Sequence, residues 1–185
     1  MMPEISLNIL DVAENSTRAG ASLVSISVQI DTANDRLSVR IQDDGCGMTA
    51  EQIAQVTDPF FTTRKTRKVG LGVPFFKSAA ELTGGSFSIA STVGVGTCVT
   101  AVFVLSSIDR MPLGDMTATM HSLIVYHPET DFLYTYQYDE RSFTLDTREF
   151  RQILEGLPLD TPEVSQYIRE YLMENKAETD NGRLI

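Results

Sequence analysis

Two stretches near the N-terminus alternate apolar and polar side chains, and this alternation constrains the fold more than any other feature of the sequence. Residues 23–30 and 37–42 place Val, Ile or Leu at every second position. A period of two residues is typical of a strand with one buried face, and the Thr-Ala-Asn-Asp turn at 32–35 predicts that the two strands form an antiparallel hairpin. The apolar face of such a sheet must be covered by a second layer.

Helices with apolar faces are the expected cover for this sheet. Apolar residues recur at helical spacing across residues 4–19, and Gly20 ends that helix. The same rules predict a helix over 50–56 capped by Thr49, a helix over 73–83 with Pro74 in its first turn, and strands over 86–90 and 97–105. The predicted fold class is therefore α+β, a two-layer sandwich with a mainly antiparallel sheet and helices on one face.

The rest of the chain is expected to form a smaller unit. We interpret residues 106–119, which contain Pro112 and Gly114, as a linker that follows a domain of residues 1–105. Residues 120–185 are interpreted as an acidic C-terminal extension. Its expected elements are a hairpin, with strands over 123–126 and 132–136 around a turn at 127–130, and helices near 147–155 and 162–175.

Charge and composition narrow the classes of function. The net formal charge is −10, and residues 106–185 hold seven Lys and Arg against fifteen Asp and Glu. An acidic chain of this kind argues against nucleic acid as a partner, because the phosphates would be repelled. No apolar run reaches the roughly 18 residues that a membrane span needs, and the N-terminus lacks a signal-peptide pattern. We expect a cytoplasmic protein with no membrane partner.

Three pairs of glycines mark positions where the backbone could approach a ligand closely. Each pair alone is most simply an ordinary turn. The middle pair leads into a helix N-terminus, where free N–H groups favour phosphate, and the basic run 64–68 lies directly before it. The pairs are Gly45 with Gly47, Gly70 with Gly72, and Gly94 with Gly96.

Three polar side chains could serve a nucleotide. The amide oxygen of Asn15 is a suitable hard ligand for Mg²⁺, and Asp43, at the end of a strand, could accept a hydrogen bond from an exocyclic amine such as that of adenine. Asp11 lies one helical turn before Asn15 and could orient or deprotonate a water. Each also has an ordinary interpretation, as a bond to the loop at Gly20, a turn cap and a solvated helix residue respectively.

Five segments in this order resemble the GHKL, or Bergerat-fold, ATPase superfamily of gyrase B, heat-shock chaperones, histidine kinases and MutL. The resemblance covers residues 4–105. Residues 10–21 are similar to the N box of the superfamily, and most similar to its MutL form. The other segments are 43–48 for the first glycine box, 58–64 for the F box of histidine kinases, 70–73 for the second glycine box and 94–97 for the closing glycine-threonine turn.

The resemblance implies ATP and Mg²⁺ as cofactors and gives each matching position a role. Asn15 would coordinate Mg²⁺, Asp43 would bind the adenine amine, and residues 64–69 would form a short lid over the nucleotide. Asp11 would occupy the catalytic position. The ATP-binding residues that it implies are Asn15, Asp43, Gly45, Gly47, Met48, Phe60, Thr63, Arg64, Lys65, Gly70, Leu71, Gly72, Val73 and Thr97.

Two departures from the superfamily guide the expected activity. Hydrolytic members have Glu where this chain has Asp11, which is one methylene shorter. Histidine kinases of the usual layout carry a phosphoacceptor His before the N box, whereas the histidines here are His121 and His127. We therefore expect a stand-alone, histidine kinase-like module that binds Mg-ATP and phosphorylates or regulates a partner protein.

Two alternative functions stay open at this point. One is a slow ATPase that acts as a conformational switch, as in the MutL and gyrase B branch, and the other is a non-catalytic nucleotide sensor. In the module that phosphorylates or regulates a partner, the acidic C-terminal half would provide the surface for that protein or for a homodimer.

Overall fold

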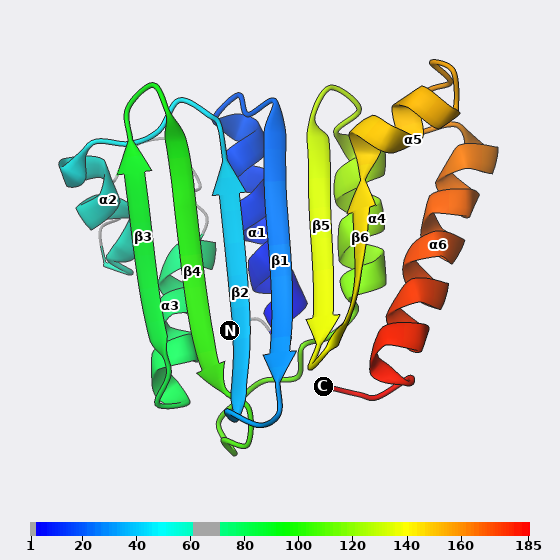
Figure 1. Ribbon diagram of the computed structural model, residues 1–185. Coiled ribbons are helices and arrows are strands. Elements are labelled where there is room, and N and C mark those ends of the chain that lie inside the picture. The colour runs from blue at the N-terminus through cyan, green and yellow to red at the C-terminus, as the bar shows by residue number, and fades with distance from the viewer. Residues whose placement is uncertain (1–2, 61–70) are drawn as a thin grey trace.

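One six-stranded sheet organises the protein, and every helix packs against it or beside it (Figure 1). The computed structural model describes residues 3–60 and 71–185. The strand order is β3-β4-β2-β1-β5-β6. The strands are β1 (Leu23–Asp31), β2 (Arg36–Asp43), β3 (Ser86–Thr92), β4 (Gly96–Val104), β5 (Asp131–Tyr138) and β6 (Arg141–Asp146). The helices are α1 (Ile5–Arg18), α2 (Ala50–Thr57), α3 (Gly72–Leu82), α4 (Met116–Tyr126), α5 (Thr147–Ile153) and α6 (Pro162–Asp180).

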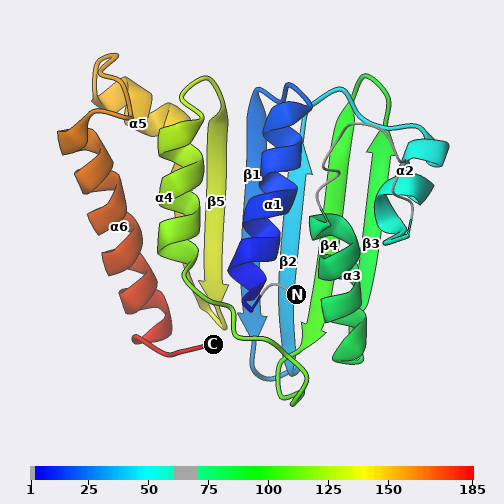
Figure 2. The same ribbon diagram turned by 180° about the vertical axis from the view of Figure 1, so that it is seen from behind.

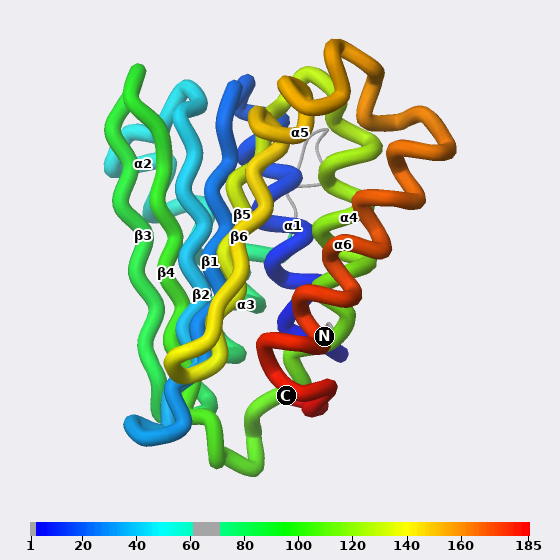
Figure 3. Tube along the Cα trace, turned by 45° about the vertical axis from the view of Figure 1, so that its right-hand side comes forward, coloured from blue at the N-terminus to red at the C-terminus, as the bar shows by residue number. Residues whose placement is uncertain are grey.

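The fold has two layers, as the sequence predicts. Seen from behind, α1, α3 and α4 lie across one face of the sheet, and the oblique view separates the helical layer from the strands (Figures 2 and 3). Neighbouring strands are antiparallel except for β1 and β5, which are parallel. The predicted α+β class with a mainly antiparallel sheet is therefore confirmed.

The predicted β1–β2 hairpin forms, and it is antiparallel with one buried face, as expected. Ile26 pairs with Ile41, and Val28 pairs with Val39, so the alternating apolar residues of both strands share one face. These four side chains are buried, as are Ile5 and Ile9 of α1. Apolar burial stabilises this interface by roughly 25 cal/mol for each Å² removed from water. The core thus fixes how α1 lies on the central strands.

The predicted strand over 123–126 is wrong, because these residues form the last turn of α4. Leu123, Ile124 and Val125 suggest a strand by propensity, but the buried residues of this segment recur at helical spacing, namely Met116, Thr119, Met120, Leu123 and Ile124. The side chain of Asp115 caps the helix by accepting a 2.8 Å hydrogen bond from the amide of Ala118. The segment predicted as a linker therefore ends in helix rather than in loop.

A hairpin does exist in the C-terminal part, but a different pair of segments forms it. β5 pairs with β6, and β5 also lies parallel to β1 from Leu23–Asp131 to Ile30–Tyr138. The C-terminal strands therefore extend the sheet that the N-terminal strands begin. The division of the chain at residue 105 into two domains stays a prediction.

The two C-terminal helices form where they are predicted, and α6 continues five residues beyond its predicted end. The carboxylate of Asp180 explains this length, because it is fully buried and accepts hydrogen bonds from Lys176 Nζ at 2.6 Å and from the Tyr136 hydroxyl at 2.9 Å. Among the described residues, no helix is long and apolar enough to cross a membrane.

Candidate functional site

A pocket of about 550 Å³ opens at one end of the sheet, between α1, the β2 end, and the first turn of α3. Its walls are mostly aliphatic, which suits a flat aromatic ligand. The apolar wall residues are Val12, Ile41, Val56, Val73, Ile89 and Val99. Polar side chains also line it, and among them are four that carry the argument below: Asn15, Ser16, Asp43 and Thr97.

Asp43 is held in a fixed orientation at the end of β2. Its Oδ2 accepts a 2.6 Å hydrogen bond from the Ser16 hydroxyl. Its Oδ1 accepts hydrogen bonds from the backbone amides of Gly45 at 2.9 Å and Thr97 at 3.3 Å. A carboxylate oxygen can accept more than one hydrogen bond, so Asp43 keeps capacity for a donor that enters the pocket.

The first glycine turn is packed too tightly for any other residue at Gly47. Its φ is +69°, and a Cβ atom there would lie 2.0 Å from the carbonyl oxygen of Thr92. The turn is also tied to the β3–β4 turn, because the Gly94 amide donates a 2.8 Å hydrogen bond to the Cys46 carbonyl. Gly47 therefore lets the β2 end and the β3–β4 turn meet at the rim of the pocket.

Ser91 links three parts of this rim. Its hydroxyl oxygen accepts a 2.8 Å hydrogen bond from the Met48 amide and lies 2.8 Å from the Thr97 hydroxyl. It also donates to the Gly96 carbonyl at 3.0 Å. Because β3 pairs with β4 in this register, Ser91 lies directly beside Thr97. The predicted residues Met48 and Thr97 are thus positioned by a serine that the sequence does not single out.

Asp44 follows Asp43 in the sequence, but its carboxylate bonds to other parts of the chain and does not line the main pocket. Its carboxylate accepts hydrogen bonds from the Ser22 hydroxyl and from the amides of Ser22 at 2.8 Å and Leu23 at 3.0 Å. The Ser22 hydroxyl is the main reason that the pKa of Asp44 lies below its usual value. The adjacent carboxylates therefore have different surroundings, and only Asp43 lines the main pocket.

Asn15 enters the pocket from α1, one helical turn before the end of that helix. Its side-chain amide makes no hydrogen bond to any part of the chain within 3–60 and 71–185. An amide oxygen without a protein partner suits a Mg²⁺ ion, which takes few protein ligands and keeps oxygens from water and phosphate. The side-chain amide oxygen of Asn15 therefore fits the Mg²⁺ ion that the sequence predicts.

Asp11 does not line the pocket and instead packs beneath the start of α3. A Cβ atom on Gly72 would lie 1.9 Å from Asp11 Oδ2, so only glycine allows this approach. The same oxygen is buried and has no hydrogen-bond partner within the described part of the chain. The structure therefore brings Asp11 and Gly72 together, at a place where the Asp11 carboxylate is covered by α3.

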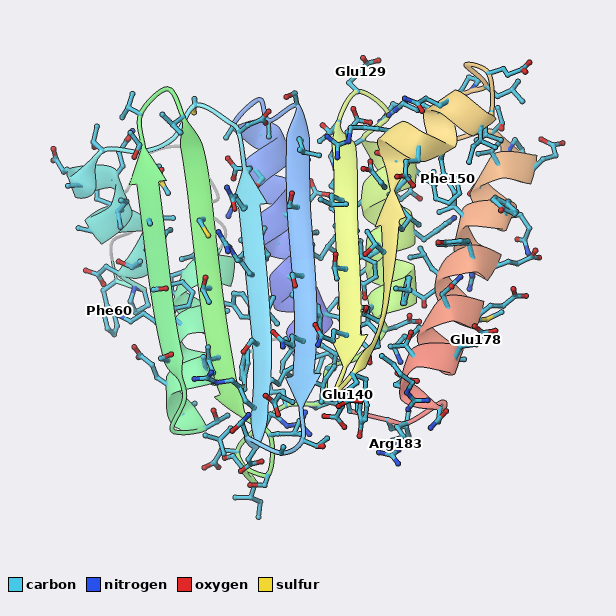
Figure 4. All side chains as sticks on the ribbon, viewed as in Figure 1. Phe60, Glu129, Glu140, Phe150, Glu178 and Arg183 are labelled. Atoms are coloured by element: carbon cyan, nitrogen blue, oxygen red, sulfur yellow. The ribbon has the colours of Figure 1, made fainter. Side chains whose placement is uncertain are left out.

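The other predicted residues lie outside the pocket lining. Gly45 contributes its amide to Asp43, Phe60 is 90% exposed on the β3 side of the molecule (Figure 4), and Leu71 is 43% exposed just before α3. Four predicted positions fall outside the described residues, namely Thr63, Arg64, Lys65 and Gly70. The ligand-binding roles of all these residues stay predictions.

Besides apolar wall residues, four further residues line the pocket without being among the predicted site residues. They are Ser16, Arg18, Ala19 and Cys46. Ser16 carried a usable signal, because it follows Asn15 directly and shares the buried face of α1 with Val12. The other three follow only from where the α1 end meets the glycine turn, since the Cys46 amide donates a 3.0 Å hydrogen bond to the Ala19 carbonyl.

Comparison with curated proteins finds bacterial sensor proteins. The chain is 30% identical over 107 residues to a putative sensor protein of Shewanella frigidimarina, a match that covers 57% of this chain and 16% of that protein. It is 30% identical over 114 residues to the cell-division control histidine kinase PdhS of Brucella anthropi, covering 54% of this chain and 10% of that protein. The matched segment is thus less than a fifth of either relative.

Comparison with solved structures shows the same fold. The ATPase domain of Aquifex aeolicus MutL, complexed with ADP, superposes with a TM-score of 0.50 at 13% identity, over 84% of this chain and 70% of that chain. The family described as histidine kinase-, DNA gyrase B- and HSP90-like ATPase matches residues 3–107, which is more than half of the sequence. The chain therefore belongs to the histidine kinase-, DNA gyrase B- and HSP90-like ATPase family.

Proposed function

We propose that the protein binds Mg-ATP in the 550 Å³ pocket and uses it to phosphorylate or regulate a partner protein. The observation that carries this proposal is the environment of Asp43. Its carboxylate is fixed by Ser16, Gly45 and Thr97 while it still faces an aliphatic pocket. A carboxylate fixed in this way accepts a hydrogen bond from the exocyclic amine of adenine, and guanine presents a carbonyl at that place.

The polar end of the pocket suits the phosphates and their metal. Asn15 provides a hard oxygen ligand for Mg²⁺. Helix α3 begins at Gly72, and the amides at a helix N-terminus, which have no partner within the helix, favour negatively charged groups. Bound Mg-ATP would supply a transferable phosphoryl group. The chain's own residues bind and orient the nucleotide, with Asp43 at the base and Asn15 toward the phosphates.

The position of Asp11 favours transfer or regulation over an independent ATPase cycle. Its carboxylate is covered by Gly72 and does not line the pocket. General-base catalysis of hydrolysis would need this oxygen within hydrogen-bond reach of a water beside the γ-phosphate. The slow ATPase switch would therefore require α3 to move away from α1 in the nucleotide complex.

The acidic C-terminal half is the proposed surface for the partner. Residues 106–185 carry fifteen acidic and seven basic side chains, and Glu178 projects outward from α6 (Figure 4). Several acidic residues of α6 are exposed, namely Glu163, Glu170, Glu174 and Glu178. An acidic helix face would guide a basic partner toward the protein and would disfavour an acidic one.

The test compares two adjacent carboxylates. Calorimetric titration with Mg-ATP and Mg-GTP is run on the wild type, on Asp43→Asn and on Asp44→Asn, which is the matched control outside the main pocket. Loss of a charged hydrogen-bond acceptor in Asp43→Asn should weaken ATP binding by about tenfold or more and reduce the preference for ATP. Equal affinities in all three proteins, or no binding by the wild type, would contradict the proposal.

A further inference from the structure

Three polar side chains form a row across three neighbouring strands of the sheet, β2, β4 and β3 (Figure 1). Asp43 on β2 pairs with Thr97 on β4, and Thr97 pairs with Ser91 on β3. Because side chains alternate between the two faces of a strand, Thr97 shares the face of Val99, which is buried and also lines the nucleotide pocket. Asp43 and Thr97 therefore line the pocket side by side, and Ser91 is the next residue of the row.

The hydroxyl of Ser91 makes as many hydrogen bonds as its atoms allow. Its proton goes to the Gly96 carbonyl at 3.0 Å, and its oxygen accepts from the Met48 amide at 2.8 Å. The Thr97 hydroxyl oxygen lies 2.8 Å from the same Ser91 oxygen. A hydroxyl has one proton to donate and two lone pairs. All three contacts are two-centre hydrogen bonds only when the Thr97 hydroxyl donates to Ser91.

This direction of the hydrogen bond leaves the Thr97 oxygen as an acceptor. Among the described residues, the Thr97 hydroxyl makes no other hydrogen bond, so the lone pairs of its oxygen stay unused. Asp43 is also an acceptor, with about four lone-pair sites on its two oxygens. The Ser16 hydroxyl and the amides of Gly45 and Thr97 fill three of these sites. Asp43 and Thr97 therefore present two acceptors next to each other.

We propose that Ser91 is a positioning residue that adapts this wall of the pocket to a primary amino group. The inference rests on the proposed binding of ATP and concerns how the base is selected. Ser91 does not line the pocket and acts through Thr97, whose proton it takes. The exocyclic amine of adenine has two N–H groups, one for Asp43 and one for Thr97. A base without this amine leaves both acceptors without a donor, which weakens binding.

The test compares two nucleotides that differ only in this amine. Purine riboside triphosphate has a hydrogen atom where ATP has the amine, so it adds no bulk. Calorimetric titration with the two Mg²⁺ complexes is run on the wild type, on Ser91→Ala and on Ser91→Thr, which keeps the hydroxyl. Ser88→Ala is the matched control, because Ser88 is exposed and lies on the opposite face of the same strand.

The expected result is a change in the preference between the two nucleotides. Ser91→Ala allows the Thr97 hydroxyl to turn its proton toward the pocket. The ratio of the affinity for ATP to that for purine riboside triphosphate should therefore fall by about fivefold. Ser91→Thr should restore the ratio, and Ser88→Ala should keep it.

Two results would overturn the proposal, and they are distinguishable. If Ser91 has a structural role alone, Ser91→Ala weakens both nucleotides by the same factor and the ratio does not change. That outcome would overturn this inference and leave the proposed function intact. Absence of ATP binding by the wild type would overturn the proposed function and this inference with it.

Discussion

The hydroxyl of Ser16 donates a 2.6 Å hydrogen bond to Oδ2 of Asp43, and this contact joins α1 to the end of β2. The two residues are 27 positions apart in the sequence, and Ser16 is buried. The bond fixes the carboxylate before any ligand enters. Pre-organisation of this kind lowers the cost of binding, because the acceptor does not have to be ordered by the nucleotide.

Ser16→Ala should therefore weaken both folding and nucleotide binding. A hydrogen bond to a charged group contributes about 1.5–3 kcal/mol, so we expect the free energy of unfolding to fall by about 2 kcal/mol and ATP affinity to fall by about tenfold. Thr17→Ala is the matched control, since among the described residues the Thr17 hydroxyl bonds only to the Glu14 carbonyl of its own helix. Denaturant titration and calorimetry measure the two quantities, and equal effects from both variants would contradict the role of Ser16.

Asn15→Ala should reveal the metal site. If Asn15 is a Mg²⁺ ligand, the variant should lose ATP affinity by about tenfold or more in Mg²⁺ buffer and much less in EDTA, because the nucleotide then binds without the metal. Calorimetric titration in the two buffers gives the comparison. Equal losses in both buffers would remove Asn15 from the metal site.

Two glycines with similar backbone angles should respond differently to alanine. Gly47 and Gly94 have φ values of +69° and +79°, but a Cβ on Gly47 would lie 2.0 Å from the Thr92 carbonyl, whereas a Cβ on Gly94 meets nothing within 4 Å. Gly94→Ala should lower the free energy of unfolding by about 1 kcal/mol, because of the backbone angle alone. Gly47→Ala should lower the free energy of unfolding by several times as much, since the glycine turn and the β3–β4 turn must move apart to admit the Cβ. Similar melting temperatures for the two variants would contradict this packing.

The elements that the sequence predicts are those in which local pattern and tertiary burial agree. The strands β1 and β2 alternate with a period of two, and the same alternation places Ile26 and Val39 in the core. In α4 the local pattern and the tertiary burial favour different structures. The strand propensity of Leu123–Val125 is local, whereas the helical spacing of buried residues from Met116 to Ile124 reflects packing on β5 and α1. Packing decides the outcome there.

The residues of the candidate site also fall into two groups, those with a signal in the local sequence and those placed by tertiary contacts. Asp43 and Gly47 carry their own signal, because a strand end followed by a glycine turn is visible in the sequence. Ser91 does not, since its contact with Met48 depends on the pairing of β3 with β4. The covered position of Asp11 likewise depends on how closely α3 approaches α1 at Gly72. Such contacts between distant segments cannot be inferred from spacing along the chain.

Protection of Cys46 from alkylation is the most direct test of nucleotide binding in this pocket. Cys46 is an exposed free thiol that lines the pocket, and Cys98, a free thiol on β4 outside it, is the internal control. Iodoacetamide labelling of both thiols is followed by mass spectrometry, with and without saturating Mg-ATP. We predict that Mg-ATP slows Cys46 labelling by at least about tenfold, through steric exclusion from the filled pocket, and leaves Cys98 unchanged. Equal Cys46 rates with and without Mg-ATP would contradict the assignment of this pocket to ATP.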